Sequence, residues 1–147
     1  MKVAALVALV LVTAGCVNPV PLSATIETSA TQQTTVGSRA QLLVKLTNTG
    51  PAIPHLGLVF RTADRWYEHH TVSDLGGCAL AADASAFDCG DVGAGATASF
   101  LIVGTAKEAG TFHYELALRE LVRPFDYVNE HPDGADVHIW DETVTPK

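Results

Sequence analysis

The amino-acid sequence predicts an all-β sandwich formed by a single domain. Turn-forming residues recur along the chain, and the segments between them alternate apolar and polar residues. Evidence for helices is thin, because the alanine-rich segment 79–86 is interrupted by Asp83 and Ser85. Without its first 15 residues, the chain has the length of one domain with a hydrophobic core. Two packed sheets are the economical architecture for this pattern.

The clearest predicted strand lies within residues 39–47. Ala40, Leu42, Val44 and Leu46 share one face there, whereas most residues between them are polar. Such a period of two is typical of a half-buried strand. The same test predicts strands in 55–61, 97–102, 112–119 and 136–140, and less regular strands in 22–28 and 66–73.

Residues 1–15 have the pattern of a signal peptide. Lys2 supplies a positive charge, residues 3–12 are an unbroken apolar run, and small residues follow. The run is too short for a transmembrane helix, which needs about 20 apolar residues. The sequence therefore predicts an exported chain.

The segment Thr13-Ala14-Gly15-Cys16 resembles the bacterial lipobox, although Thr13 stands where Leu is usual. The resemblance implies cleavage before Cys16 and attachment of lipid to its sulfur. It also implies a lipid anchor in the cell membrane or outer membrane, with the domain on the extracytoplasmic side. Several acyl chains anchor a protein stably, whereas one does so only marginally. The alternative is an ordinary secretory signal with an incidental cysteine.

The remaining chain divides into a short linker and a domain. Residues 16–21 contain Pro19 and Pro21 and are predicted to form a stiff spacer, and residues 22–147 form the domain. With Cys16 lipidated, Cys78 and Cys89 remain as a natural disulfide pair in an oxidising compartment. A bridge across so short a loop contributes about 3 kcal/mol. Two free thiols, or a metal site on two cysteines, are the less favoured alternatives.

The chain contains four short motifs: Val36-Gly37, Leu46-Thr47-Asn48-Thr49-Gly50-Pro51, the block from Phe87 to Phe100, and Gly110-Thr111-Phe112. These motifs resemble a bacterial Ig-like repeat of surface proteins, a domain of unknown function, and the related cell-adhesion domain of bacteria. The resemblance covers most of residues 22–145. It implies an Ig-like antiparallel β-sandwich of about seven strands, a similar placement of the two cysteines, and no catalytic residues. That family usually occurs as tandem repeats, whereas this chain has one copy.

Turn residues within these motifs have predicted structural roles. Asn48 and Gly50 suit a turn that ends a strand, because both residue types tolerate a positive φ. Gly93 and Gly95 are expected to act in the same way before the strand that contains Phe100.

A metal site is one candidate for the histidines. In the last two long strands the predicted outward sets are His113 with Glu115, and His138 with Trp140. If those strands pair, His113, Glu115 and His138 could approach one another, but the register does not follow from the sequence, and a solvated polar face is the alternative. His69 and His70, if in a strand, point to opposite faces. No cofactor is predicted.

A recognition loop is the second candidate. Residues 119–134 carry Phe125 and Tyr127 among charged residues, and aromatic anchors are typical of binding loops. Trp140 is an exposed candidate on the neighbouring face. The alternative is that the two loop aromatics cover an open end of the core. Trp66 is expected in the core, as a buried tryptophan is common in sandwiches.

The sequence excludes several function classes. Nucleophile elbows, zinc-protease helices and phosphate-binding glycine loops are missing, which predicts a protein that is not an enzyme. A net charge of −7 disfavours nucleic acid as a partner. We expect a lipid-anchored interaction or adhesion module that recognises a protein or cell-envelope partner. A metal-binding lipoprotein and an accessory subunit of an envelope complex are the alternatives.

Overall fold

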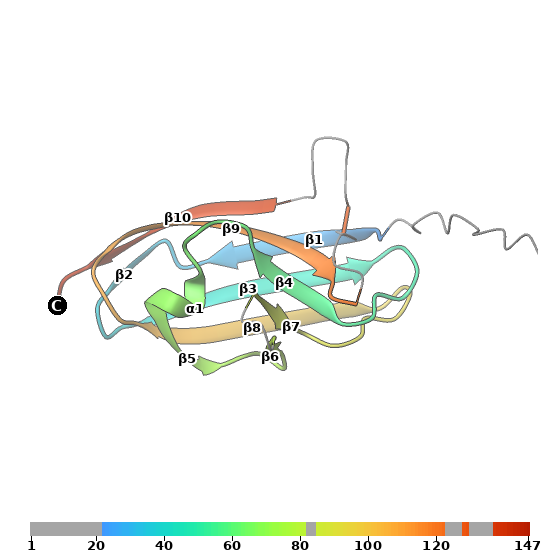
Figure 1. Ribbon diagram of the computed structural model, residues 1–147, viewed down its shortest axis with the longest axis horizontal. Helices are drawn as coiled ribbons and strands as arrows, with labels where there is room; N and C mark the ends of the chain where they lie inside the picture. Colours follow the sequence, from blue (N-terminus) through green and yellow to red (C-terminus); the bar gives the residue numbers. More distant parts are fainter. Residues whose placement is uncertain (1–21, 82–84, 123–127, 130–136) are drawn as a thin grey trace, which may run out of the picture.

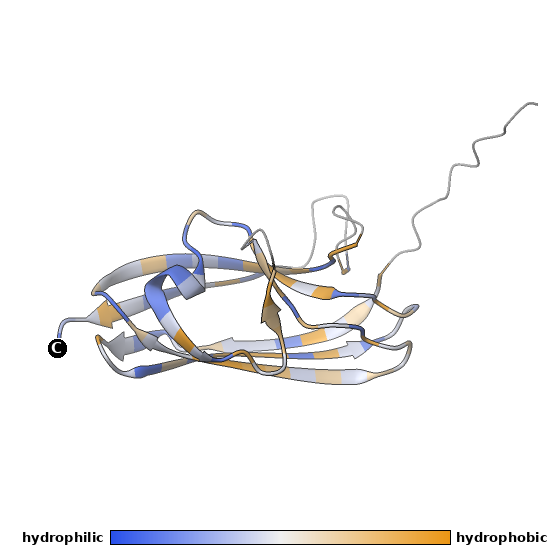
Figure 2. Ribbon diagram, turned by 60° about the horizontal axis from the view of Figure 1, so that its bottom comes forward, coloured by the Kyte–Doolittle hydropathy of each residue, from blue (hydrophilic) through white to orange (hydrophobic). Residues whose placement is uncertain are grey.

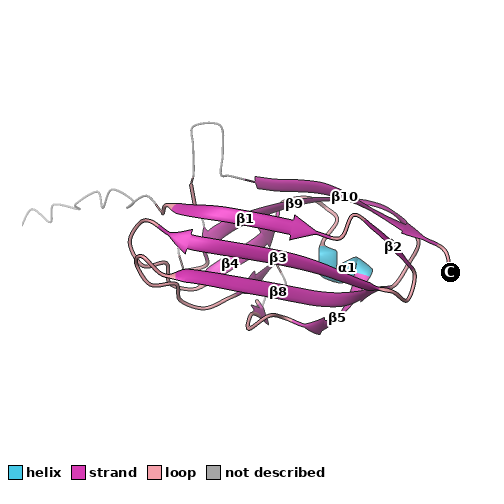
Figure 3. Cartoon of the chain, turned by 180° about the vertical axis from the view of Figure 1, so that it is seen from behind, coloured by secondary structure: helices cyan, strands magenta, loops and turns pink. Residues whose placement is uncertain are grey.

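Two β-sheets pack face to face and hold the core between them (Figures 1 and 3). The structure is a computed structural model and describes residues 22–81, 85–122, 128–129 and 137–147. The first sheet contains, in order, β1 (Ala24–Ala30), β3 (Arg39–Asn48), β8 (Thr97–Ala106) and β5 (His70–Asp74). The second contains β2 (Gln33–Thr35), β10 (Val137–Thr145), β9 (Gly110–Glu120), β4 (Leu56–Phe60), β7 (Ala86–Asp88) and β6 (Ala79–Leu80). The predicted all-β sandwich is confirmed.

The core follows the alternation predicted for β3, β8 and β9, and Figure 2 shows hydropathy alternating along the long strands. Leu42 and Val44 of β3 are fully buried, as are Tyr114 and Leu116 of β9. Strand β4 differs, because all five of its residues are buried. Leu121 lies where a side chain at Gly57 would project, so the outer face of β4 is covered as well.

Strand pairing leaves both sheets open on the same side of the sandwich. β1 ends the first sheet and pairs only with β3 among the described strands. In the second sheet, β2 pairs with β10 over residues 143–145 alone, and this pair is parallel, unlike the predicted antiparallel pattern. The remainder of β10 pairs only with β9 among the strands described. Figure 3 shows β1 and β10 running beside each other at this open side.

The turn after β3 is held by the side chain of Asn48 rather than by its backbone conformation. This side chain is buried; its Oδ1 accepts the Gly50 N–H at 2.9 Å, and its Nδ2 donates to the carbonyl of Pro51 at 2.7 Å. Gly95 has a φ of 72°, as predicted. β3 ends at this turn, as predicted, although Asn48, Gly50 and Gly93 do not have a positive φ.

A disulfide joins Cys78 to Cys89, which confirms the predicted pair. It lies where β6 begins and β7 ends, and the two strands are paired with each other. The bridge therefore fastens the last hairpin of the second sheet.

The segment predicted as a strand over 66–73 begins instead with one helical turn, α1 (Trp66–His69), and continues as β5. Trp66 is fully buried, as expected. Within the described ranges, the chain has no helix that is long and apolar enough to cross a membrane. Three short strands, β2, β6 and β7, were not predicted.

Candidate functional site

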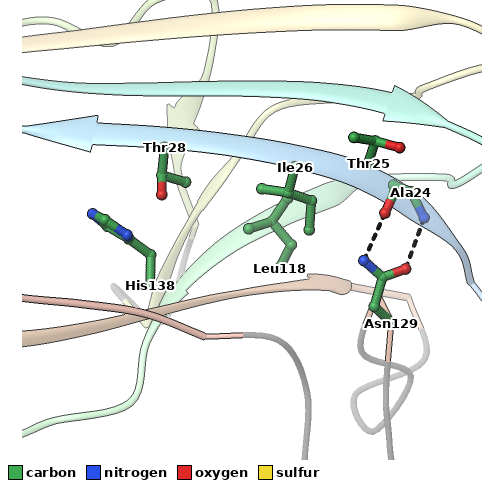
Figure 4. Close-up of a pocket in the computed structure, with 7 residues that line it drawn as sticks. All are labelled: Ala24, Thr25, Ile26, Thr28, Leu118, Asn129 and His138. Atoms are coloured by element: carbon green, nitrogen blue, oxygen red, sulfur yellow. Dashed lines mark hydrogen bonds between the residues drawn. The ribbon is translucent and has the colours of Figure 1, made fainter.

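A groove with a volume of about 480 Å³ follows the open side of the sandwich (Figure 4). β1 forms one wall, and β9 and β10 form the other. Ile26 and Leu118 lie near its middle, and Thr28 lies opposite His138 at one end. The lining consists of Ala24, Thr25, Ile26, Thr28, Leu118, Asn129 and His138.

The wall formed by β1 is a strand edge. Successive residues of a strand direct their N–H and C=O groups to alternate sides, and the carbonyl of Ser23 and the N–H of Thr31 bind the β3 side. Ala24, Ile26 and Thr28 therefore direct their backbone groups away from β3. In the described part of the chain, no hydrogen bond reaches the backbone groups of Ile26 or Thr28. Each of these two residues therefore presents a backbone donor and acceptor that no described residue pairs.

Asn129 closes the first part of this edge. Its Oδ1 accepts the N–H of Ala24 at 2.8 Å, and its Nδ2 donates to the carbonyl of the same residue at 2.6 Å (Figure 4). The backbone N–H of Asn129 donates to the carbonyl of Leu22 at 2.9 Å. Asn129 has a φ of 54°, a conformation that asparagine tolerates better than most residues. Among the described residues, the edge is thus paired at 22–24 and open at Ile26 and Thr28.

His138 forms the opposite rim of the groove. Its ring stacks on Trp140 with centroids 5.1 Å apart. Burial lowers the pKa of His138 below its ordinary value of 6.5, because the charged form loses solvation. The imidazole is therefore mainly neutral at pH 7 and can both donate and accept a hydrogen bond.

His113 and Glu115 lie on the outer face of β9, as predicted, but their partner is Asp141. Nδ1 of His113 lies 2.7 Å from Oδ1 of Asp141, and its Nε2 lies 3.6 Å from Oε1 of Glu115. The hydrogen bond to Asp141 is the main cause that raises the pKa of His113, and Glu115 adds to it. Two carboxylates thus favour the protonated imidazole.

The predicted metal trio is not assembled, because His138 faces the groove on the other side of the sheet. The residues of β10 alternate as predicted, but the face predicted to point outward, with His138 and Trp140, points into the sandwich. Trp140 is 4% exposed and its ring centroid lies 5.0 Å from that of Tyr114 inside the sandwich, whereas Ile139 is 57% exposed. Among the residues that the structure describes, no group of three or more His, Cys, Asp or Glu side chains is arranged to hold a metal ion.

Three further predicted residues lie outside the described residues: Cys16, Phe125 and Tyr127. The lipidation site and the aromatic part of the predicted recognition loop therefore stay predictions. Trp140, the third predicted binding residue, lies in the core and is not a surface contact.

The sequence prediction missed a buried polar pair between the sheets. Nε2 of His70 on β5 lies 3.1 Å from Oε1 of Glu142 on β10, and both side chains are fully buried. Nδ1 of His70 lies 2.8 Å from the carbonyl oxygen of Trp66, whose ring stacks on the imidazole. The available signal was Glu142 itself, a charged residue in step with Trp140 and Val144.

Comparison with known proteins supports the fold. The chain resembles the CARDB domain of a Pyrococcus furiosus protein, solved by NMR, with a TM-score of 0.54 and 12% identity, over 86% of this chain and 98% of that domain. A crystal structure of that domain, described as a complex with di-metal ions, gives a TM-score of 0.51 and 12% identity over 88% and 99% of the chains. Such a likeness shows an Ig-like β-sandwich, as predicted. No family model and no curated protein matches the sequence.

Proposed function

We propose that this protein is a lipid-anchored, extracytoplasmic interaction module that recognises a protein or cell-envelope partner. The observation that carries the proposal is the groove beside the open edge of β1, where backbone donors and acceptors have no described partner. A concave surface with a few converging polar groups is a usual form of a binding site. Similarity to an adhesion-related domain is consistent with this role.

The anchor is supported by the sequence alone. The apolar run, the lipobox-like segment and the pairing of Cys78 with Cys89 leave Cys16 as the cysteine available for lipid. The tether would hold the domain at the surface of the cell membrane or outer membrane. An acidic chain of net charge −7 also disfavours nucleic acid as its partner.

The Cys16→Ser variant tests the anchor. We expect it to lose incorporation of labelled fatty acid and to leave the membrane fraction, or to remain unprocessed, while it keeps the disulfide. A properly cleaved Cys16→Ser chain that stayed in the membrane fraction would overturn the anchor without affecting the interaction role.

Site-specific photo-crosslinking in intact cells tests the interaction. A photoreactive residue at Thr28 in the groove is compared with one at Leu101, which is exposed on β8. We expect a discrete adduct from position 28 and none from position 101. Equal or absent adducts at both positions would contradict recognition through the groove. In the same assay, an unchanged adduct pattern in the Phe125→Ala, Tyr127→Ala double variant would remove the loop 119–134 from the interface.

A further inference from the structure

We infer that the groove binds an extended polypeptide segment of alternating apolar and basic residues, which joins the first sheet as an additional strand beside β1. The inference rests on the proposed interaction role and specifies how the partner is held and which chemistry it has. Strand addition to an exposed sheet edge is a general mode of peptide recognition.

The hydrogen-bonding pattern of the edge is the first argument. Ile26 and Thr28 direct their N–H and C=O groups into the open side, spaced as they would be for a neighbouring strand. The Asn129 side chain shows how this edge pairs, because its amide places a donor and an acceptor against Ala24, as the N–H and C=O of one residue in a neighbouring strand would. A bound segment would continue this ladder where Asn129 ends.

The inner face of the groove selects alternate side chains of the segment. Ile26 and Leu118 provide an apolar floor, and His138 provides a neutral polar rim. Every second side chain of an added strand would point toward this floor. Apolar side chains of moderate size fit there, because they remove apolar surface from water.

The outer face selects the intervening side chains by charge. Glu27 is exposed on β1, and Lys45 lies directly across from it on β3. An added strand would place its own side chain on the opposite flank of Glu27, where a Lys or Arg forms a favourable cross-strand pair. The net charge of −7 favours the approach of a basic segment.

A second copy of the chain is a poorer occupant of this edge. Two β1 strands could pair in an antiparallel manner with Ile26 of one copy opposite Thr28 of the other. In that register, Glu27 of one copy lies opposite Glu27 of the other. Like charges directly opposite each other destabilise a strand pair. Asn129 already forms a hydrogen bond with the backbone of Ala24, and this contact shortens the edge available for such pairing.

The test measures binding of short capped peptides to the full chain in detergent, by calorimetry and by hydrogen exchange at Ile26 and Thr28. A peptide of alternating Val and Lys should bind and protect both amides. The Val and Glu peptide should bind about tenfold more weakly, and Glu27→Lys should reverse this order. A Val and Lys peptide with N-methylated alternate amides should not bind, because its hydrogen-bonding edge is blocked.

The matched chain variants are Thr28→Pro and Thr28→Val. Proline removes an N–H that points away from β3, which strand edges tolerate, whereas valine keeps it. We expect Thr28→Pro to lose peptide binding and Thr28→Val to retain it. If Thr28→Pro does not fold, the N-methylated peptide still decides between strand addition and side-chain binding.

The outcomes separate this inference from the proposed function. Strand addition would be overturned if the N-methylated peptide bound as tightly as the unmodified Val and Lys peptide. It would also be overturned if no peptide bound and the amides of Ile26 and Thr28 were not protected from exchange. A discrete crosslink at Thr28 in cells would then still support an interaction role. Self-association that Thr28→Pro abolishes would identify a second copy as the occupant instead. If peptides bound but no partner were crosslinked in cells, strand addition at the edge of β1 would be supported and the proposed interaction role would be contradicted.

Discussion

At the scale of single residues, His70 and Glu142 form a cross-link between the two sheets. Their side chains come from β5 and β10 and meet in the core, where no water competes for the hydrogen bond. Oε2 of Glu142 and the hydroxyl of Tyr114 are also buried, without a hydrogen-bond partner among the described atoms. Burial, followed by the charge of Glu142, raises the pKa of Tyr114, so this phenol stays protonated.

Replacement of Glu142 by alanine should destabilise the fold, because His70 would keep a buried ring nitrogen without its partner. Removal of one member of a buried pair costs about 3 kcal/mol. Urea unfolding followed by tryptophan fluorescence measures this loss. Asp141→Ala, an exposed change on the same strand, is the control and should have little effect. Equal stability of both variants would show that the pair does not hold the sheets together.

Asp141→Asn should lower the pKa of His113 toward its ordinary value of 6.5, because the main favourable contact of the imidazolium is removed. The protonated form is the one stabilised in the fold. Its contribution to stability is therefore present below about pH 6.5 and is lost as the pH rises through the raised pKa of the folded state. NMR titration of His113 measures the change. The pKa of His138 serves as control and should not move.

At the scale of elements, α1 packs against β8 through a glycine. A Cβ at Gly104 would lie 2.9 Å from the Trp66 ring and 3.1 Å from Cβ of His70. The helical turn can therefore lie close to the strand only where β8 has no side chain.

Gly104→Ala should destabilise the protein by about 1–3 kcal/mol, because the added methyl forces Trp66 or His70 to shift. Gly93→Ala is the matched control. Its added Cβ would lie 3.9 Å from the Cβ of Ala96, an ordinary contact distance, and its φ is not positive. Thermal unfolding measures the stability of both variants. If Gly93→Ala lost as much stability as Gly104→Ala, the packing explanation would be excluded.

Most long strands could be predicted from the sequence, because β3, β8 and β9 bury one apolar face and follow the period of two. The side chains of β10 could not be oriented in this way. Apolar patterning favours Ile139 as the buried residue, but Trp140 has more surface to bury and packs against Tyr114. The same choice of face buries Glu142, whose partner His70 lies on a distant strand. A pairing between residues 72 positions apart leaves no local signal.

The groove could not be predicted for a related reason. Its edge exists because β1 lies at the end of one sheet and β2 covers only part of β10, and both are properties of topology. Asn129 fell inside the segment 119–134 that was predicted to recognise a partner, but its role is to pair with Ala24. The disulfide, by contrast, followed from counting cysteines.

At the scale of the whole molecule, electrostatics should control how fast a basic segment binds. Raising the ionic strength from about 0.05 M to about 0.5 M screens an acidic protein and should slow the association of the Val and Lys peptide several-fold. Stopped-flow fluorescence measures the rate. The dissociation rate should change less, and an association rate independent of salt would indicate that the net charge of −7 plays no part in recruitment.

β1 begins at one end of the sandwich, and the chain terminates at the other (Figure 1). Between Cys16 and Ala24 the chain can span at most about 29 Å when fully extended. A lipid on Cys16 would therefore keep the domain close to the bilayer. With such an anchor, the groove could capture only segments that come within a few nanometres of the bilayer.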